Sequence, residues 1–391
     1  MRICILSSFE DSLSGDTGYS VRIYSLAKWL AKLGNEVSVI IPGFDTTVSK
    51  MDHFVVYKIP AFLPKTVLNL LAKLLRIAKS TALVFYDPLF VFRIRKLIHS
   101  ADIVQIEQPT AGGFLVLIIA KILKKSVVVD SHDVFQALRV EYTSKIRRIL
   151  ETFIEVIVYK YASLILTVSE KEKAILASLG IPDEKINVTP NGVDIERFVI
   201  SDMNFANFKR KYGLENYRVV VFVGNMEYSP NMEAVRLIAT KIAPLVCKEF
   251  DNVKFLIVGR YIEKINSPYL IFTGTVKDII EPLAIAELAI APLFRGSGTR
   301  LKILEYLAYG LPVISTTKGV EGLKLENGAC LIIEDEITEF ARSIIQLLTN
   351  SDITKRLRKN AKEFIMNYDW EKISVQLHET YEEFLRKKSA C

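Results

Sequence analysis

The sequence APLFRGSGTRLKILEYLAYGLPVIS, residues 291–315, decides the fold class. An apolar strand pattern ends at Pro292, and a loop with two glycines follows it. A run of strong helix formers then begins near Thr299 and stops at Gly310, after which a second strand pattern covers residues 312–315. This order of strand, loop, helix and strand is typical of a parallel α/β sheet, which binds ligands at the carboxyl ends of its strands.

The loop in this stretch has the chemistry of a phosphate site. Backbone N–H groups at the start of a helix carry partial positive charge, and Gly296 and Gly298 let a ligand come close to them. Arg300 adds a permanently charged fork of donors for phosphate oxygens. Glu305, further along the same helix, could accept hydrogen bonds from ribose hydroxyls. A plain helix cap explains most glycine loops, so the loop alone does not identify a ligand.

The same alternation of strands and helices continues along the rest of the chain. Strands are expected in the first half at residues 3–6, 36–41, 103–106, 126–129 and 164–168, and in the second half at 218–223, 254–258, 270–272, 288–291 and 329–333. Helices are expected at 21–33, 144–161 and 170–179. The turn-rich stretch 190–194 separates the two series, so we expect two doubly wound domains that face each other across a cleft.

The composition indicates a reduced, globular protein that does not span a membrane. The chain has 391 residues, of which 50% are hydrophobic and 24% charged, and this length is more than one domain usually needs. Its four cysteines are too scattered for a zinc or redox motif. The amino terminus lacks the pattern of a signal peptide, and no apolar run approaches the roughly 20 residues of a membrane span. We therefore expect a cytoplasmic protein.

One segment concentrates positive charge. Residues 65–96 hold seven Lys and Arg but one Asp, interleaved with Leu and Phe, in a chain of net charge +7. Two interpretations stay open: an amphipathic surface that attaches the protein to the inner face of an anionic membrane, or ordinary core-packing helices with basic exposed faces. No nucleic-acid recognition motif accompanies the charge, so nucleic acid is not an expected partner.

The segment GSGTRLKILE, residues 296–305, resembles the nucleotide-sugar signature of the family 4 glycosyltransferases, also called glycosyl transferases group 1. It is similar to the branch whose loop reads Gly-Ser-Gly-Thr-Arg. Further similarities cover residues 190–198, 223–231, 273–278 and 368–370. The resemblance implies the GT-B fold, with a Rossmann-like acceptor-side domain over residues 1–200. The fold would continue with a nucleotide-sugar-binding domain over residues 201–365. A helix over residues 366–391 would then return to the first domain.

The resemblance also implies an activity. A hexose would pass from a nucleotide-sugar donor, with UDP- and GDP-sugars expected first, to a hydroxyl of a glycan or lipid-linked acceptor in cell-surface glycan or glycolipid synthesis. The transfer would retain the anomeric configuration, without a metal or other obligatory cofactor. The residues implied to bind the donor are Gly15, Gly18, Gly224, Asn225, Gly274, Val276, Gly296, Ser297, Gly298, Thr299, Arg300, Lys302 and Glu305.

Three residues are expected to act in the reaction: His132, Arg300 and Glu305. His132 follows a predicted strand end and matches a histidine that lies near the donor sugar in members of the family, although a lone histidine is more often structural. Asp133 would either orient this histidine or cap the next helix. Glu107 also follows a strand, and it could face the acceptor.

The sequence departs from the family pattern at two places. Ser297 stands where many members carry the first glutamate of a Glu-x7-Glu pair, which puts contacts to the transferred sugar in doubt. Residues 226–229 read Met-Glu-Tyr-Ser where many members have an arginine and a lysine. Two alternatives therefore stay open, a nucleotide-sugar epimerase on the same scaffold and a catalytically inactive nucleotide-sugar or membrane-surface binder. Detection of sugar transfer to an acceptor would exclude both.

Overall fold

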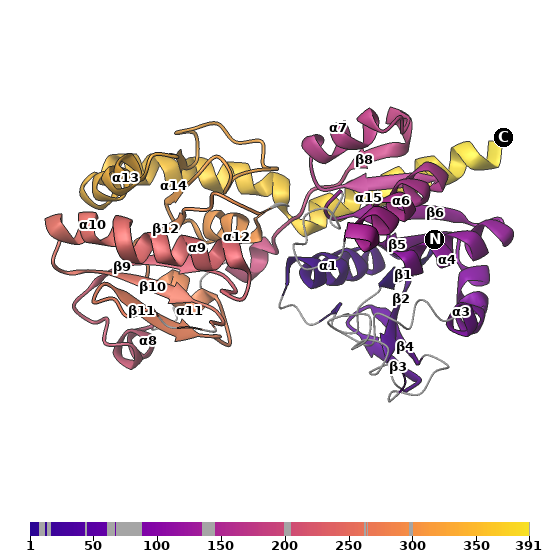
Figure 1. Cartoon of the computed structure of the whole chain (residues 1–391), viewed down its shortest axis with the longest axis horizontal. Coiled ribbons are helices and arrows are strands. Elements are labelled where there is room, and N and C mark those ends of the chain that lie inside the picture. The colour runs from indigo at the N-terminus through magenta and orange to yellow at the C-terminus, as the bar shows by residue number, and fades with distance from the viewer. Residues whose placement is uncertain are drawn as a thin grey trace. The chain divides into compact units, whose positions relative to one another are not determined.

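The computed structural model describes residues 1–7, 12–13, 17–43, 45–60, 67, 88–134, 145–198, 205–261, 263, 265–296 and 300–390. Its contacts divide the chain into two compact units. The N-terminal unit comprises Met1–Asn191 together with Trp370–Cys391, and the C-terminal unit comprises Gly192–Asp369. Each unit is built on one sheet with helices on both of its faces (Figure 1), so the predicted α/β class is confirmed for both.

The sheet of the N-terminal unit has the strand order β3-β4-β2-β1-β5-β6-β7-β8 over the described residues. Its strands are β1 (Arg2–Ser7), β2 (Glu36–Gly43), β3 (Thr47–Met51), β4 (Phe54–Pro60), β5 (Ile103–Glu107), β6 (Ser126–Ser131), β7 (Leu164–Thr167) and β8 (Ile186–Val188). All pairs are parallel except β3 with β4. The direction of strand addition reverses between β1 and β5, and open α/β sheets bind ligands at such a switch point.

Two helical layers cover this sheet. On one face lie α1 (Gly18–Lys32) and α15 (Trp370–Ala390), which pack with Ile3 and Ile5 of β1. On the other face lie α3 (Pro88–Ser100), α4 (Ala111–Ile122), α6 (Lys145–Tyr161) and α7 (Glu170–Ser178), which pack with Cys4 and Leu6 of the same strand. Alternate side chains of a strand point to opposite faces, so one short apolar run contributes to both cores.

The sheet of the C-terminal unit is parallel, with the order β11-β10-β9-β12-β13-β14. Its strands are β9 (Arg218–Val223), β10 (Val253–Val258), β11 (Leu270–Gly274), β12 (Leu288–Ala291), β13 (Val313–Ser315) and β14 (Ile332–Ile333). The helices are α8 (Ala206–Lys211), α9 (Ser229–Leu237), α10 (Ala243–Glu249), α11 (Ile280–Ala284), α12 (Leu301–Tyr309), α13 (Ile337–Thr349) and α14 (Ser351–Ile365). Here the strand order reverses between β9 and β12.

The ends of the helices follow local sequence chemistry. The helix α1 begins with a capping box, in which the Thr17 hydroxyl accepts from the Ser20 backbone N–H and the Ser20 hydroxyl accepts from that of Thr17. The helix α12 begins at Leu301, two residues later than predicted, because Arg300 has the extended backbone of an N-cap. It ends at Gly310, whose φ of +83° favours glycine. Among the described residues, no helix is long and apolar enough to cross a bilayer.

Candidate functional site

A cluster of charged and amide side chains lies at the switch point of the C-terminal sheet. Lys302, in the first turn of α12, donates from Nζ to Asn231 Oδ1 at 2.8 Å. Asn231, on α9, donates in turn to the backbone carbonyl of Asn225 at 2.8 Å. These two bonds tie α12 to the loop that follows β9. The predicted residues Gly224, Asn225 and Lys302 are therefore brought together, although they come from distant parts of the sequence.

Two glycines of this cluster lie close against the ends of the side chains around them. A Cβ added to Gly224 would lie 2.8 Å from the Asn231 side-chain amide and 2.9 Å from Lys302 Nζ. At Gly296 the φ is +102°, and a Cβ there would lie 2.6 Å from both the Arg300 guanidinium and the Tyr228 hydroxyl. A side chain at either position would displace the ends of these neighbouring side chains, so the two cations approach bare backbone.

The charges of the cluster favour an anion. Arg300 is buried, with 8% of its surface exposed, and its guanidinium donates to the Arg295 carbonyl at 3.2 Å. Burial and the neighbouring Arg300 lower the pKa of Lys302 to about 7, against the opposing effect of Glu305. Burial also raises the pKa of Glu305. Two cations that lose hydration and repel each other would be stabilised by a bound diphosphate.

The other predicted donor residues continue this cluster along the strand ends. Gly274, at the end of β11, has a φ of +71° and accepts at its carbonyl from the Gly259 N–H at 3.0 Å. A Cβ on Gly259 would lie 2.1 Å from the Gly224 carbonyl oxygen. Three glycines thus lie at the ends of three adjacent strands. Sequence reasoning missed Gly259, which directly follows the apolar run of β10. Val276 is partly buried just beyond Gly274.

Some predicted residues lie outside the described part of the chain. They are Gly15, Ser297, Gly298 and Thr299. The other glycine predicted in the first domain, Gly18, is the first residue of α1 and directly follows the Thr17 cap. Arg197, which sequence reasoning missed, pairs with Asp278 at 2.9 Å, and its charge partly offsets the rise that burial causes in the pKa of Glu305.

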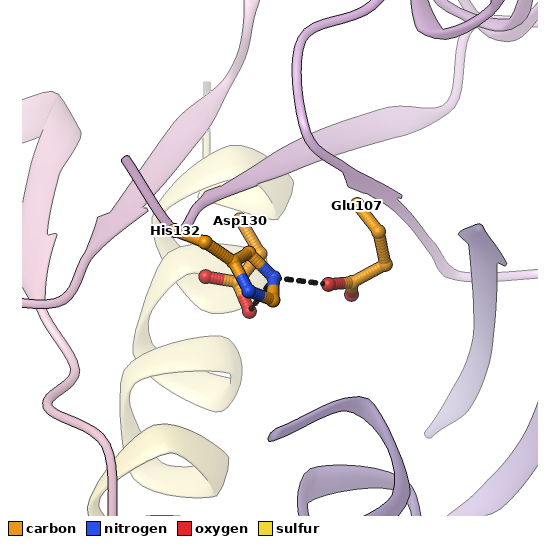
Figure 2. A group of neighbouring side chains, drawn as sticks. All are labelled: Glu107, Asp130 and His132. Carbon is orange, nitrogen blue, oxygen red and sulfur yellow. Dashed lines mark hydrogen bonds and ion pairs between the residues drawn. The ribbon is translucent and has the colours of Figure 1, made fainter. Parts of the chain in front are cut away.

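A second group of side chains lies at the ends of β5 and β6 in the N-terminal unit. Figure 2 shows that Glu107, from the last position of β5, and His132, just after β6, point toward each other. His132 Nε2 lies 2.8 Å from Glu107 Oε2 and 3.8 Å from the nearer carboxylate oxygen of Asp130. Glu107 and Asp130 are fully buried, while His132 keeps 11% of its side chain exposed. The structure thus brings two predicted strand-end residues into one pair.

A buried network holds this pair in place. The Gln105 amide donates to Glu107 Oε1 at 2.6 Å, and the Tyr381 hydroxyl of α15 donates to Gln105 Oε1 at 2.7 Å. Arg22, on α1, donates from Nε and Nη2 to the two oxygens of Asp130, both at 2.8 Å. Arg22, Asp130, Gln105 and Tyr381 were not predicted as site residues. Of these four residues, only Arg22 has a signal in the sequence, because it is a charged residue on the apolar face of a predicted helix.

The surroundings of Glu107 shift the pKa of its carboxyl upward. Burial raises the pKa of Glu107, and the negative charge of Asp130 raises it further, whereas the hydrogen bonds from His132 and Gln105 lower it. The ring of Tyr19 lies with its centroid 4.7 Å from that of His132 and limits where the imidazole can turn. An oriented imidazole beside a buried carboxyl is suited to bind a polar substrate group or to move a proton.

The same three residues resemble a metal site in spacing. One ligand atom each from Glu107, Asp130 and His132 lies within 4.8 Å of the others, in a search of the described residues. However, the Arg22 guanidinium already neutralises Asp130 and occupies both of its oxygens. We therefore interpret the group as a buried ion-pair network, and independence from metal stays a prediction.

Two family models match the chain. Glycosyltransferase Family 4 matches residues 17–197, and Glycosyl transferases group 1 matches residues 217–350. Together they cover most of both units, including the pair at Glu107 and His132 and the cluster around Lys302.

The chain is also similar to individual proteins and to solved structures. The chain is 30% identical to an uncharacterized 44.6 kDa protein in the cps region of Klebsiella pneumoniae, over 42% of this chain and 45% of that one. It is 27% identical to the phosphatidyl-myo-inositol mannosyltransferase of Mycolicibacterium smegmatis, over 49% and 50%. The chain spans about half the length of these two relatives. The structure of Anabaena HepE with UDP-glucose matches with a TM-score of 0.72 at 17% identity, over 98% of this chain and 100% of that one, which shows a shared fold.

Proposed function

The chain belongs to the glycosyltransferases of family 4 and group 1, which have the GT-B fold, and from this we propose that it transfers a sugar from a nucleotide-sugar donor to an acceptor hydroxyl. The observation that carries the proposal is the placement of two cations, Arg300 and Lys302, beside the glycine backbone at a switch point of the sheet. Such a site suits the diphosphate of a donor.

The proposed reaction breaks the bond between the anomeric carbon and the diphosphate. Negative charge then develops on the leaving phosphate oxygens. The acceptor hydroxyl forms the new bond to the anomeric carbon, and its proton passes to an oxygen of the departing diphosphate. Stabilisation of the leaving charge is the largest contribution that a protein makes to such a step. We assign the stabilisation of this charge to Arg300 and Lys302. We assign the binding of the ribose hydroxyls to Glu305. We further propose that the transfer retains the anomeric configuration, which NMR of the product would test.

We propose a UDP-sugar as the first donor to test, because the similar fold of HepE holds UDP-glucose. For the acceptor we propose a glycan or lipid-linked hydroxyl, which the similarity to a phosphatidyl-myo-inositol mannosyltransferase supports. A cytoplasmic location stays a prediction of the sequence.

A thermal-shift titration with UDP, GDP, ADP and TDP tests the donor site. We expect one nucleotide, UDP first, to raise the melting temperature with and without magnesium, since a ligand at 100 times its Kd stabilises by about 2.7 kcal/mol. Glu305→Ala should reduce this shift, whereas Glu339→Ala, an exposed carboxylate on another helix, should not. If none of the four nucleotides shifts the melting temperature, the donor assignment is wrong. Sugar transfer then separates a transferase from an epimerase and from an inactive binder.

His132→Ala separates sugar transfer from nucleotide binding. We expect it to leave the nucleotide-induced thermal shift unchanged and to lower kcat about tenfold, the effect of one lost polar contact of about 1.4 kcal/mol in the transition state. His99→Ala on the exposed side of α3 is the matched control. Unchanged kcat in the His132 variant would show that this histidine is structural.

Binding of UDP-glucose should depend on pH through Lys302. Because its pKa is lowered to about 7, Lys302 is charged below pH 7 and neutral above, and a diphosphate binds the charged form. We expect the Kd measured by calorimetry to rise by up to about tenfold from pH 6 to pH 8. Lys302→Arg, which stays charged, should bind with a flat profile. A profile that is the same in both proteins would assign the titration to another group, such as Glu305.

A further inference from the structure

Three neighbouring helices of the N-terminal unit form a layer with an unusual outer surface. The helices are α3, α4 and α6, and α4 packs against both of the others on one face of the sheet (Figure 1). Their inward side chains, such as Ile94, Val116 and Val158, belong to the core beneath them. The outward sides would be polar in a helix layer that faces water alone.

The outward sides carry large apolar side chains instead. Seven of the exposed large hydrophobic residues among the described ones belong to these helices: Phe92, Ile118, Ile122, Ile149, Leu150, Phe153 and Tyr161. Ile122 is 72% exposed and Phe153 is 63% exposed. Ile149, Phe153 and Tyr161 share one side of α6, and Ile118 and Ile122 share one side of α4, because residues four apart lie on the same face. A cluster of this kind marks a surface that binds something.

The helix α6 also places a carboxylate inward. Glu155 is buried, with 5% exposed, and it accepts a hydrogen bond from the Tyr159 hydroxyl at 3.1 Å. The exposed apolar side chains of α6 are therefore not a consequence of a helix that is apolar all round. The helix presents Ile149 and Phe153 outward while it keeps an acidic group inside.

Positive charge accompanies the apolar side chains. Arg93, Arg95 and Lys96 on α3, Lys121 on α4 and Lys160 on α6 are exposed. The helices α3 and α4 contain no acidic residue, and α6 contains two, which are partly or fully buried. The Arg95 guanidinium lies 3.6 Å from the centroid of the Phe92 ring, so cation and apolar group are adjacent.

We propose that this face of α3, α4 and α6 docks on the surface of an anionic phospholipid bilayer. The apolar side chains would enter the boundary between headgroups and acyl chains, and the surrounding cations would pair with lipid phosphates. The apolar side chains and the cations together select an anionic bilayer. A neutral bilayer would not attract the cations, and a basic protein surface would be repelled by them. The face includes the last part of the basic segment 65–96, whose residues 65–66 and 68–87 lie outside the described ones. The proposal goes beyond the sugar-transfer function and does not depend on the donor.

Cosedimentation of the full-length protein with vesicles tests the proposal. We expect binding to vesicles of phosphatidylcholine with phosphatidylglycerol that is at least tenfold stronger than to phosphatidylcholine alone. The binding should weaken at about 0.5 M salt, where surface charges are screened. Absence of binding to the anionic vesicles, or equal binding to both kinds, would overturn the proposal.

Paired variants locate the surface. The double variant Ile122→Ser with Phe153→Ser should lower the partition coefficient at least tenfold, because two large apolar side chains no longer leave water. The variant Lys121→Gln with Lys160→Gln should lower it by about 25-fold, at about fivefold per cation. Val48→Ser with Leu245→Ser, which replaces exposed apolar residues elsewhere, should bind as the parent protein does.

Two outcomes of these variants would reject the membrane as occupant. If all three variants bind vesicles equally well, the face is not involved. If the parent protein is a dimer in gel filtration and Ile122→Ser with Phe153→Ser makes it a monomer, the face binds a second copy of the chain. Circular dichroism and the nucleotide-induced thermal shift show in each case whether the variant is folded.

Discussion

Replacement of Arg300 by alanine is expected to lower kcat/KM for sugar transfer at least a hundredfold. The side chain is buried beside Gly296, where a Cβ would lie 2.6 Å from its guanidinium, so the charge reaches a stretch of bare backbone. Removal of one donor that stabilises a developing oxyanion costs on the order of 3 kcal/mol, or about a hundredfold in rate. Steady-state kinetics with UDP-glucose and any acceptor that supports turnover would measure the loss.

Arg295→Ala is the matched control for this prediction. Arg295 belongs to the same loop, but its side chain is 72% exposed and its nearest acid, Glu233, is 3.7 Å away. Its loss should change kcat/KM by less than about threefold, because an exposed pair at this distance contributes little. Near-normal turnover in Arg300→Ala, with an unchanged melting temperature, would refute the role of Arg300. A parallel loss in both variants would indicate a general requirement for positive charge.

Asp130→Ala is expected to lower the free energy of unfolding of the N-terminal unit by about 3–5 kcal/mol. Arg22 and Asp130 have fully buried side chains, and both oxygens of the carboxylate accept from the guanidinium. Removal of Asp130 would leave the Arg22 charge buried, where the Pro190 carbonyl and the Asn191 side chain still accept hydrogen bonds from its guanidinium. A buried charge that loses its counter-ion is costly because water does not replace it.

Tryptophan fluorescence can measure the loss of stability in Asp130→Ala directly. The two tryptophans of the chain, Trp29 and Trp370, both belong to the N-terminal unit, so urea unfolding followed by tryptophan fluorescence reports on that unit. Asp102→Ala breaks the pair of Arg2 and Asp102, which has a similar distance of 2.7 Å but is partly exposed. It should cost about 1 kcal/mol or less. Equal losses in the two variants would contradict the importance of burial.

A double variant separates the cost of an unpaired buried charge from the contribution of the ion pair itself. When Arg22→Met and Asp130→Leu are combined, no unpaired charge remains, and apolar side chains fill the space. The free energy of unfolding should then recover most of the loss. If stability recovers but sugar transfer does not, the pair serves the position of His132, whose Nε2 lies 3.8 Å from the Asp130 carboxylate.

The elements of both sheets could be predicted where burial leaves a local signature. The strand Arg218–Val223 is short, apolar and rich in valine, which is typical of a parallel strand covered on both faces. The strand Thr47–Met51 was missed because it lies at the edge of its sheet and exposes most of its side chains, so its sequence lacks an apolar pattern. The strand expected over 329–333 is shorter in the structure. It covers only Ile332–Ile333, at an edge of the C-terminal sheet.

The candidate site was predictable only in part. The residues from Gly296 to Glu305 form one continuous segment, so their order of loop, cation and helix is visible in the sequence. His132 and Glu107 were both predicted at strand ends, but their contact was not. The bond from Lys302 to Asn231 joins residues 71 positions apart, and nothing in either local sequence specifies that partner.

By itself, the sequence determined the α/β class and the glycosyltransferase family, because these depend on periodicity and on short contiguous motifs. That the loop at 296–300 binds phosphate stays a prediction. Only the tertiary structure decided that Arg22 pairs with Asp130, 108 positions away, and that Tyr381 supports Gln105, 276 positions away. It also decided which side of α6 turns outward. The reason is physical: strand order and helix docking bring these groups together, and each pairing depends on the whole core rather than on the preference of any local segment.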